Sequence, residues 1–257
     1  MPLQEREREI VATVFDRSEL IDRLLDGPKE KRELVEELPV SRSTVNRAIR
    51  ELETLELVER VDEGYRVTDL CRSTTTRLSA LVDSVGYEMR LQKFRKWVPD
   101  GTLEFDLADA DDATVLLPEP GNPYGMVNRH VERLREAPSH RSVLPLTGLH
   151  GYEAVHDRVV EAGVETTVVA APSVVDVLVT DPEFEPLTDA LTETDRFRLF
   201  ETEEPVPYFV GVYGDVVQFG VDDDGDPRAL YETTDTTVRE WANRRIDDYV
   251  ERAERVL

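Results

Sequence analysis

The clearest pattern of apolar and polar positions lies between residues 30 and 68. Leu34, Val35 and Leu38 recur at helical spacing until Pro39 breaks the helix. Ser41 follows as a candidate helix cap, because its hydroxyl can accept an unpaired backbone N–H of the next turn. The apolar stripe of the second helix consists of Val45, Ala48, Ile49, Leu52 and Leu55. The pattern therefore predicts two helices joined by a short turn.

A second face of the latter helix is polar and basic, with three guanidinium groups and no carboxylate. It consists of Arg42, Ser43, Asn46, Arg47 and Arg50. After the helix, Val58 to Thr68 predicts two short strands around Asp62-Glu63-Gly64, a hairpin with Arg60 and Arg66 near its tip. Helix, turn, helix and hairpin form the layout of a winged helix-turn-helix, whose second helix lies in the DNA major groove. We interpret residues 1–68 as a DNA-binding domain and these seven side chains as its candidate DNA contacts.

The regions on either side of this unit also show helical spacing. Residues 4–26 predict one broken or two short helices, with Ser18 as a second candidate cap and Gly27-Pro28 as the stop. Asp69 to Trp97 predicts one long helix. Its expected buried stripe consists of Leu70, Thr74, Leu78, Leu81, Val85, Met89, Leu91 and Phe94. We expect residues 69–98 to connect two domains, and either to form a dimer interface or to pack against the chain's own second domain.

From residue 99 onward, short apolar strands alternate with helices. Ala113–Leu117, Ser142–Leu146 and Val164–Ala170 are the predicted strands, and a helix from Met126 to Glu136 follows the first of them. This alternation predicts an α/β domain with a mixed, mainly parallel sheet over residues 99–257. The fold class is thus α/β overall, with an α+β winged helix-turn-helix at the N-terminus.

The last third of the chain predicts closely spaced strands. They are Arg196–Glu201, Tyr208–Tyr213, Val216–Val221 and Arg228–Glu232, in an antiparallel meander that continues the sheet. Asp224-Gly225 is expected to form a hairpin turn rather than part of a calcium loop, because Gly225 stands at the fourth position of that loop and not the sixth. A final helix is expected from Thr236 to Val256.

The charge is distributed unevenly, which changes how the acidity of the chain is interpreted. The net charge of −24 disfavours binding to DNA, itself a polyanion, but residues 1–98 have a net charge of −2 and residues 99–257 one of −22. Only 4 lysines accompany 27 arginines. Few lysines with abundant Asp, Glu, Thr and Val resemble the composition of proteins from extreme halophiles. The acidic half is therefore expected to stay clear of the nucleic acid.

The remaining composition excludes several classes. No apolar run approaches the ~20 residues of a membrane span, and the charged N-terminus lacks a signal-peptide core, so a cytoplasmic protein is expected. The single cysteine, Cys71, excludes an internal disulfide and a cysteine zinc finger. Cys71 is expected to be a small buried hydrophobe, the alternative being an intersubunit redox disulfide.

A candidate ligand site lies in the loops after the three expected parallel strands. Ligands in open α/β sheets bind beyond the carboxyl ends of the strands. The polar side chains in these loops are Asn122, Tyr124, His150, Tyr152 and Ser173. Ordinary turn chemistry explains each of them singly, whereas a pocket would explain the set.

Motifs for catalysis are missing from the sequence. It contains no GxGxxG, GxxxxGK[ST] or GxSxG pattern, so nucleotide binding by such loops and serine hydrolysis are unsupported. The four histidines lack the spacing of metal ligands, and no metal or cofactor is expected. The protein is therefore predicted not to be an enzyme.

Two stretches together carry a resemblance to a known family. SRSTVNRAIRELETLELVER and PVPYFVGVYGDVVQFGVDDDGDPRALYETTDTTVREWA resemble haloarchaeal winged-helix transcription regulators that carry the effector domain named after the methanogenesis regulatory protein. The resemblance covers nearly the whole chain. It implies a DNA-binding N-terminal domain, a ligand- or signal-sensing C-terminal domain and a homodimer, with the seven residues above as readers of bases and phosphates.

The sequence thus predicts a homodimeric transcription regulator that binds double-stranded operator DNA and responds to a small-molecule effector. Two other functions are consistent with the same sequence. One is an α/β enzyme whose helix-turn-helix serves only for assembly, and the other is an interaction module without a ligand.

Overall fold

The computed structural model describes residues 4–257. The chain divides into two compact units, Met1–Gly86 and Tyr87–Leu257. Each unit has a hydrophobic core made of its own residues, as expected of separate domains. Among residues 4–257, no helix combines the length and the apolar character that a bilayer crossing requires.

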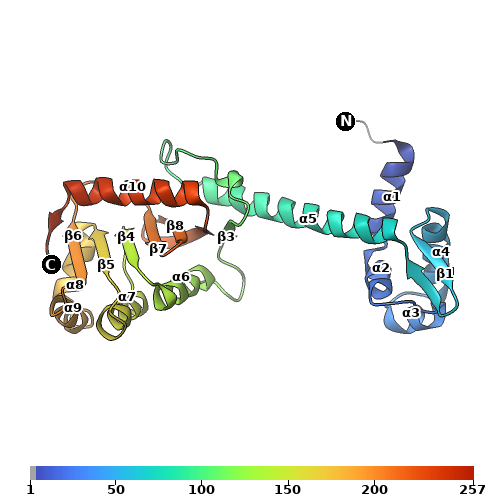
Figure 1. Cartoon of the computed structure of the whole chain (residues 1–257), viewed down its shortest axis with the longest axis horizontal. Helices are drawn as coiled ribbons and strands as arrows, with labels where there is room; N and C mark the ends of the chain where they lie inside the picture. Colours follow the sequence, from blue (N-terminus) through green and yellow to red (C-terminus); the bar gives the residue numbers. More distant parts are fainter. Residues whose placement is uncertain (1–3) are drawn as a thin grey trace. The chain divides into compact units, whose positions relative to one another are not determined.

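The N-terminal unit consists of short helices followed by a hairpin and by the start of a long helix (Figure 1). The bounds are α1 Glu5–Asp16, α2 Ser18–Leu25, α3 Lys31–Glu37, α4 Arg42–Thr54, β1 Val58–Val61, β2 Gly64–Val67 and α5 Asp69–Arg95. The two helices on either side of Pro39 and the antiparallel hairpin are therefore confirmed. Their core contains the expected stripe of α4, with Val45, Ile49 and Leu52 at most 1% exposed.

The helix starts in this unit confirm one predicted cap and correct the other. The Ser41 hydroxyl accepts the backbone N–H of Thr44 at 3.2 Å, as predicted. Ser18 does not cap α2, because α1 continues to Asp16 and the Arg17 N–H still bonds the Thr13 carbonyl at 3.0 Å. Arg17 therefore serves as both the C-cap of α1 and the N-cap of α2.

The hairpin is extended by a backbone pairing that the sequence pattern did not predict. Lys29 and Tyr65 exchange backbone hydrogen bonds, with N···O distances of 3.0 and 2.8 Å. Beside them Gly64 adopts φ 125°, and a Cβ built there would lie 2.3 Å from the Lys29 carbonyl oxygen. Only glycine fits this close approach, so the segment after Gly27-Pro28 is tied to the base of β2.

The long helix α5 extends from one unit into the other. Cys71 near its start is buried in the N-terminal core, and Leu91 and Phe94 near its end are buried in the C-terminal core. The prediction of a continuous buried stripe is wrong. Leu81 and Met89 are 59% and 60% exposed, because nothing within residues 4–257 covers the middle of α5.

The C-terminal unit is built around one large sheet flanked by helices. Its elements are η1 Leu107–Asp109, β3 Thr114–Leu116, α6 Gly125–Glu136, β4 His140–Leu144, α7 Leu149–His156, η2 Asp157–Glu161, β5 Thr166–Ala170, α8 Pro172–Thr180, α9 Glu185–Thr192, β6 Phe197–Glu201, β7 Phe209–Tyr213, β8 Val216–Asp223, β9 Asp226–Thr233, α10 Thr236–Arg252 and β10 Glu254–Arg255. The strand order in the sheet is β10-β6-β5-β4-β7-β8-β9-β3. The α/β class with a mixed sheet is confirmed.

The expected balance of parallel and antiparallel pairs is wrong. Only β4–β5 and β5–β6 are parallel among the seven strand pairings within this sheet, as residues 4–257 form it. β6, expected in the antiparallel meander, lies parallel to β5, whereas β3, expected among the parallel strands, pairs antiparallel with β9 at the sheet edge. The apolar pattern predicts a buried strand but does not determine its neighbours, which long-range pairing decides.

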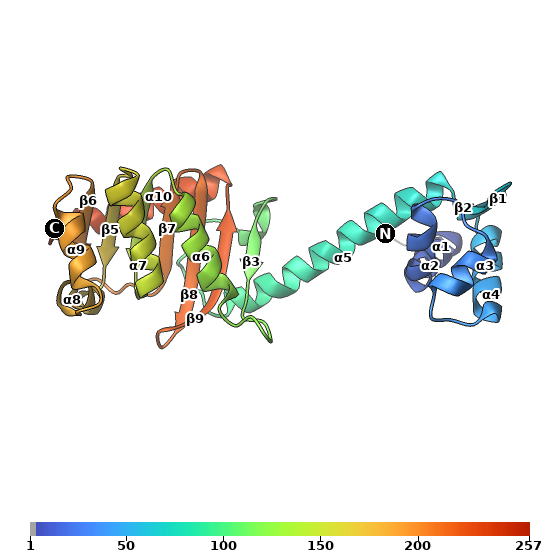
Figure 2. The same cartoon turned by 90° about the horizontal axis from the view of Figure 1, so that it is seen from below.

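Helices cover both faces of this sheet. α10 lies along one face, and α6, α7, α8 and α9 lie on the other (Figures 1 and 2). The predicted Asp224-Gly225 turn is confirmed, since both residues have positive φ, 55° and 87°, as a two-residue hairpin turn requires. α10 ends at Arg252, earlier than predicted, because Glu254 and Arg255 pair with β6 as strand β10.

Candidate nucleic-acid interface

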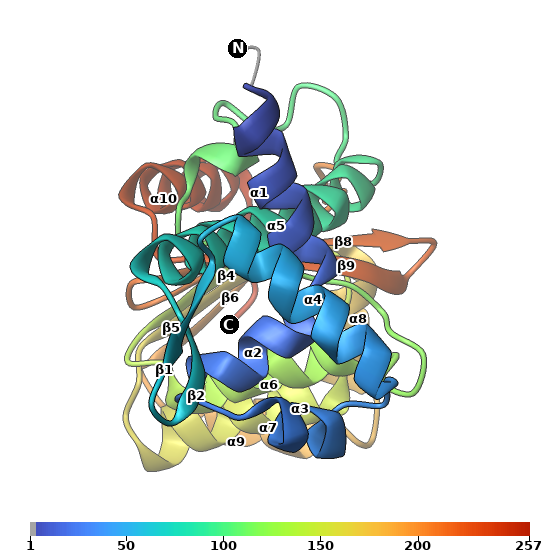
Figure 3. The same cartoon turned by 90° about the vertical axis from the view of Figure 1, so that its right-hand side faces the viewer.

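The basic face of α4 is open to solvent. Arg42, Arg47 and Arg50 are exposed, and none of them forms an ion pair with any of residues 4–257. Figure 3 turns the N-terminal unit towards the viewer and shows α4 in the foreground. Because Val45, Ala48, Ile49 and Leu52 are buried on the inner side, the helix period forces the three arginines outward. The helix therefore presents three guanidinium groups that have no ion-pair partner in the described part of the chain.

The basic face contains no carboxylate between Arg42 and Arg50 of α4. Ser43 and Asn46 lie on α4 between these arginines. Ser43 is exposed and Asn46 is partly buried. Glu53 stands three residues after Arg50 on the same side, where it introduces a carboxylate into the last turn. The surface suited to a polyanion thus runs from Arg42 to Arg50.

Hydroxyl groups form a small network at the start of α4. The Ser41 oxygen lies 2.8 Å from the Ser43 oxygen and 2.9 Å from the Thr44 oxygen. Ser43 is therefore oriented by the cap rather than free to rotate. A hydroxyl held in this way can still donate or accept one further hydrogen bond.

The two hairpin arginines differ in their surroundings. Arg60 on β1 is exposed and has no ion-pair partner among residues 4–257. Arg66 on β2 donates from Nε to Glu59 Oε1 at 2.7 Å across the hairpin. Its charge is thus partly balanced within the hairpin, and Arg60 is the better placed of the two to meet a polyanion.

An ion pair behind α4 was missed by the sequence pattern. Arg17, between α1 and α2, donates to Glu51 of α4 from Nε at 3.0 Å and from Nη2 at 2.8 Å. The two residues are 34 positions apart, so no periodicity or local motif indicates their contact. Their pairing joins the C-terminal half of α4 to the first two helices.

The five candidate ligand residues do not come together. β3 runs in the same direction as β4, so the loops after β3, β4 and β5 leave the same sheet edge as expected. However, β7, β8 and β9 lie between β3 and β4. At strand spacings near 4.8 Å, the carboxyl end of β3 therefore lies about 19 Å along the sheet from that of β4, and the loop of Asn122 and Tyr124 leads from there to the start of α6.

The remaining three ligand candidates also face different surroundings. His150 is exposed and lies 3.1 Å from Glu153, and Ser173 is exposed on α8. The Tyr152 hydroxyl is buried 2.8 Å from the Thr188 hydroxyl, and burial raises the pKa of Tyr152 to about 12. Two surface cavities of this unit, of about 280 and 580 Å³, are lined by other residues.

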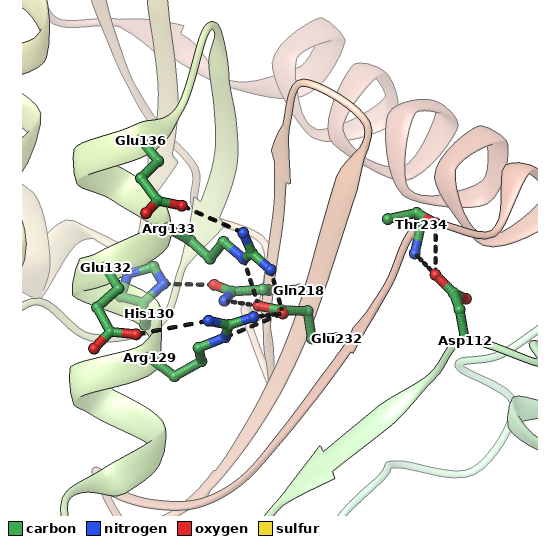
Figure 4. Close-up of polar contacts among 9 residues, drawn as sticks. All are labelled: Asp112, Arg129, His130, Glu132, Arg133, Glu136, Gln218, Glu232 and Thr234. Carbon is green, nitrogen blue, oxygen red and sulfur yellow. Dashed lines mark hydrogen bonds and ion pairs between the residues drawn. The ribbon is translucent and has the colours of Figure 1, made fainter.

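The main polar cluster of the C-terminal unit lies beneath α6 and was also missed (Figure 4). Glu232 of β9, whose side chain is 8% exposed, accepts hydrogen bonds from Arg129 at 2.7 Å and Arg133 at 3.0 Å. Gln218 of the neighbouring strand β8 donates to the same carboxylate at 2.8 Å. Burial alone would raise the pKa of Glu232, but the bonds from Arg133, Arg129 and Gln218 outweigh it and hold this pKa below its usual value.

Two histidines lie next to this cluster, His130, which is partly buried, and His140, which is buried. The Gln218 amide nitrogen points to a carboxylate, so its Oε1 must face His130 Nδ1, 2.8 Å away. His130 therefore donates from Nδ1, which agrees with a neutral ring because burial lowers its pKa. Burial likewise lowers the pKa of His140 to about 3. Both histidines are neutral structural groups near neutral pH.

No metal site is present in the part of the chain from residue 4 to residue 257. No three His, Cys, Asp or Glu side chains there are grouped so as to hold an ion. Asp112, also shown in Figure 4, instead anchors the start of α10 by accepting the Thr234 N–H at 2.7 Å.

The chain is similar to two known protein families. Residues 123–252 match the family described as "Methanogenesis regulatory protein FilR1, middle domain", and residues 5–90 match the family described as "HVO_A0261 N-terminal domain". None of the curated proteins matches the chain.

Among solved structures, the archaeal chromatin protein TrmBL2 is 15% identical over 97% of this chain and 99% of its own, with a TM-score of 0.45. NucT from Helicobacter pylori is 12% identical over 55% of this chain and 97% of its own, with a TM-score of 0.44. Nuc from Salmonella typhimurium, a phospholipase D family member, is 12% identical over 56% and 98%, with a TM-score of 0.43. TM-scores of this size describe only a loose likeness.

Proposed function

The chain belongs to the FilR1 middle-domain family, which is named after a methanogenesis regulatory protein, and we propose that it is a sequence-specific DNA-binding transcription regulator. The observation that carries the proposal is the exposed set of Arg42, Arg47 and Arg50 on α4, none of which has an ion-pair partner among residues 4–257. Guanidinium groups in one row suit phosphates and the acceptor edge of guanine in the major groove. Together these groups make the local potential positive in an otherwise acidic protein, which suits a polyanion.

In this proposal residues 1–68 form a winged helix-turn-helix, with α4 as the recognition helix. Ser43 and Asn46 lie beside the three arginines and contact bases or phosphates. Arg60 and Arg66 on the β1–β2 hairpin act as wing contacts, Arg60 more strongly because Arg66 is paired with Glu59. Residues 69–98 connect this domain to an effector domain at residues 99–257.

The direct test starts from genomic DNA, because the operator is not known. The full-length tagged protein is used to select fragments, and binding to the enriched fragment is measured by gel shift at high potassium chloride. Sequence-specific retention of one fragment class over shuffled DNA is expected. Equal retention of both would contradict specific binding, and no retention would contradict DNA binding altogether.

We further propose that the protein is a homodimer formed through α5. Leu81, Val82, Val85 and Met89 make an apolar row that is 51–60% exposed, on the helix face opposite Tyr87. An exposed apolar row of this kind marks an interface in a soluble protein. A two-fold dimer would place two recognition helices about 34 Å apart and would require a roughly palindromic operator.

Substituting Val85 with glutamate is expected to convert the dimer to a monomer, because two charges would meet at the two-fold interface. Size-exclusion chromatography with light scattering measures the change in mass. Ala80→Glu is the matched control, since Ala80 is exposed on the opposite side of α5 and should leave the dimer intact. A monomeric parent protein, or a dimer that tolerates Val85→Glu, would refute this interface.

The effector proposal concerns the C-terminal unit. A ligand that binds the folded state raises the unfolding temperature of that unit, and both tryptophans, Trp97 and Trp241, lie in it. Intrinsic tryptophan fluorescence of the full chain, heated with sugars and central metabolites, is therefore expected to identify an effector. Turnover of a metabolite in the same screen would instead favour the α/β enzyme alternative, and the expectation that the protein is not an enzyme stays a prediction until then.

A further inference from the structure

Arg47 and Glu51 stand four residues apart on α4, the spacing at which oppositely charged side chains on a helix form an ion pair. Such a pair would direct the Arg47 guanidinium along the helix and balance its charge. The structure does not contain it: within residues 4–257, Arg47 has no ion-pair partner. The Glu51 carboxylate is instead held by another group.

Arg17, which lies between α1 and α2, holds the Glu51 carboxylate. Its Nε and Nη2 both donate to Glu51 Oε2, at 3.0 and 2.8 Å. The Arg17 side chain is 24% exposed and that of Glu51 41% exposed, so the pair is partly shielded from water. A charged hydrogen bond with two donors has a defined direction, and here it turns the carboxylate towards α1 and α2.

The position of Arg17 makes this arrangement rigid. Its backbone is the C-cap of α1 and the N-cap of α2, and its N–H bonds the Thr13 carbonyl at 3.0 Å. A residue held by two helix ends places its guanidinium more reproducibly than one in a loop. Glu51 of α4 is thus held by a side chain that is anchored at the junction of α1 and α2.

We propose that Arg17 is a positioning residue for DNA binding, which keeps Arg47 free for the nucleic acid by holding the Glu51 carboxylate. The inference rests on the proposed function of α4.

The test compares operator binding by full-length variants, measured by fluorescence anisotropy at the lowest salt that leaves the far-UV circular dichroism unchanged. Arg17→Gln is expected to weaken binding about fivefold over two half-sites, because Glu51 is released to pair with Arg47. Glu51→Gln alone should bind at least as well as the parent. Arg17→Gln/Glu51→Gln should return to within about twofold of the parent, since the competing carboxylate is gone.

A matched control separates pairing from net charge. Arg17→Gln/Glu53→Gln has the same net charge as the rescuing double variant, but Glu53 is six residues from Arg47 and cannot pair with it. It should therefore keep most of the loss. If Arg17→Gln does not fold, Arg17→Met keeps the apolar stem of the side chain and takes its place.

The outcomes distinguish this inference from the function on which it rests. In an Arg47→Ala background, Arg17→Gln is expected to have no further effect, because the guanidinium it protects is absent. Persistent loss in Arg17→Gln/Glu51→Gln would overturn the inference and indicate that Arg17 touches DNA itself or only stabilises the fold. Unchanged binding in Arg47→Ala, or no DNA binding by the parent, would overturn the proposed function together with this inference.

Discussion

Replacing Arg47 with alanine is expected to lower operator affinity by about 10- to 100-fold, the largest effect of any single change in the N-terminal unit. Arg47 lies in the middle of the exposed basic face and has no competing partner among residues 4–257. A bidentate arginine contact to a guanine contributes about 1–3 kcal/mol, or about 5- to 160-fold in affinity, and the expected loss lies within that range. Gel shift or anisotropy at constant potassium chloride measures the loss, and Arg50→Ala is expected to behave similarly.

Arg32→Ala is the matched control for this prediction. It removes the same charge from an exposed position on α3, where Arg32 is paired with Glu36 at 3.0 Å. The resulting change in operator affinity should be small and should vary only with the salt concentration. If Arg47→Ala and Arg50→Ala both bind as well as Arg32→Ala, α4 is not the recognition helix.

The second large effect is expected at Glu232 in the C-terminal unit. Glu232→Gln removes the carboxylate that Arg129 and Arg133 of α6 share. The side chains of these two arginines are only 35% and 25% exposed. Breaking such a cluster destabilises by about 2 kcal/mol, less than for a fully buried pair, because the arginines keep some water. For a unit of this size the midpoint of thermal unfolding should fall by about 4–8 °C. Tryptophan fluorescence reports it, since both tryptophans lie in this unit.

Glu136→Gln provides the control, because Glu136 contacts the same Arg133 at 3.4 Å but its side chain is 73% exposed. Its substitution should change stability by less than about 0.5 kcal/mol. If the unfolding midpoint of Glu136→Gln falls as far as that of Glu232→Gln, burial of the Glu232 carboxylate does not explain the loss of stability.

The same cluster predicts how stability depends on pH. The folded-state pKa of Glu232 lies below its usual value of 4.5, so its contribution is complete above that pH and is lost as the pH falls through the folded pKa. The difference between the parent and Glu232→Gln should therefore be constant from pH 7 to about 5 and shrink below about 4.5. Chemical unfolding curves at several pH values measure it, and a difference that grows on acidification would contradict the assignment.

Local signals in the sequence were sufficient for the elements themselves. The apolar stripe of α4, the Ser41 cap and the Asp224-Gly225 turn depend on residues within a few positions of one another, and all three are confirmed. The outward direction of Arg42, Arg47 and Arg50 followed from the same helix period. Periodicity also predicted α5, but not that its middle is uncovered.

Other features depended on contacts between distant parts of the chain. The parallel pairing of β6 with β5 was one of them, and so was the place of β3 at the sheet edge, separated from β4 by three strands. The Arg17–Glu51 pair and the cluster around Glu232 join residues 34 and about 100 positions apart, so no spacing rule indicates them.

The sequence by itself determined which segments are helices and hairpin and which side of α4 carries positive charge, because backbone hydrogen bonding and side-chain period are local properties. Only the tertiary structure decided the order of the strands and the partner of each buried charge. It also decided that Arg47 has no ion-pair partner among residues 4–257. These depend on which distant side chain arrives beside a group, and that is set when the whole chain packs.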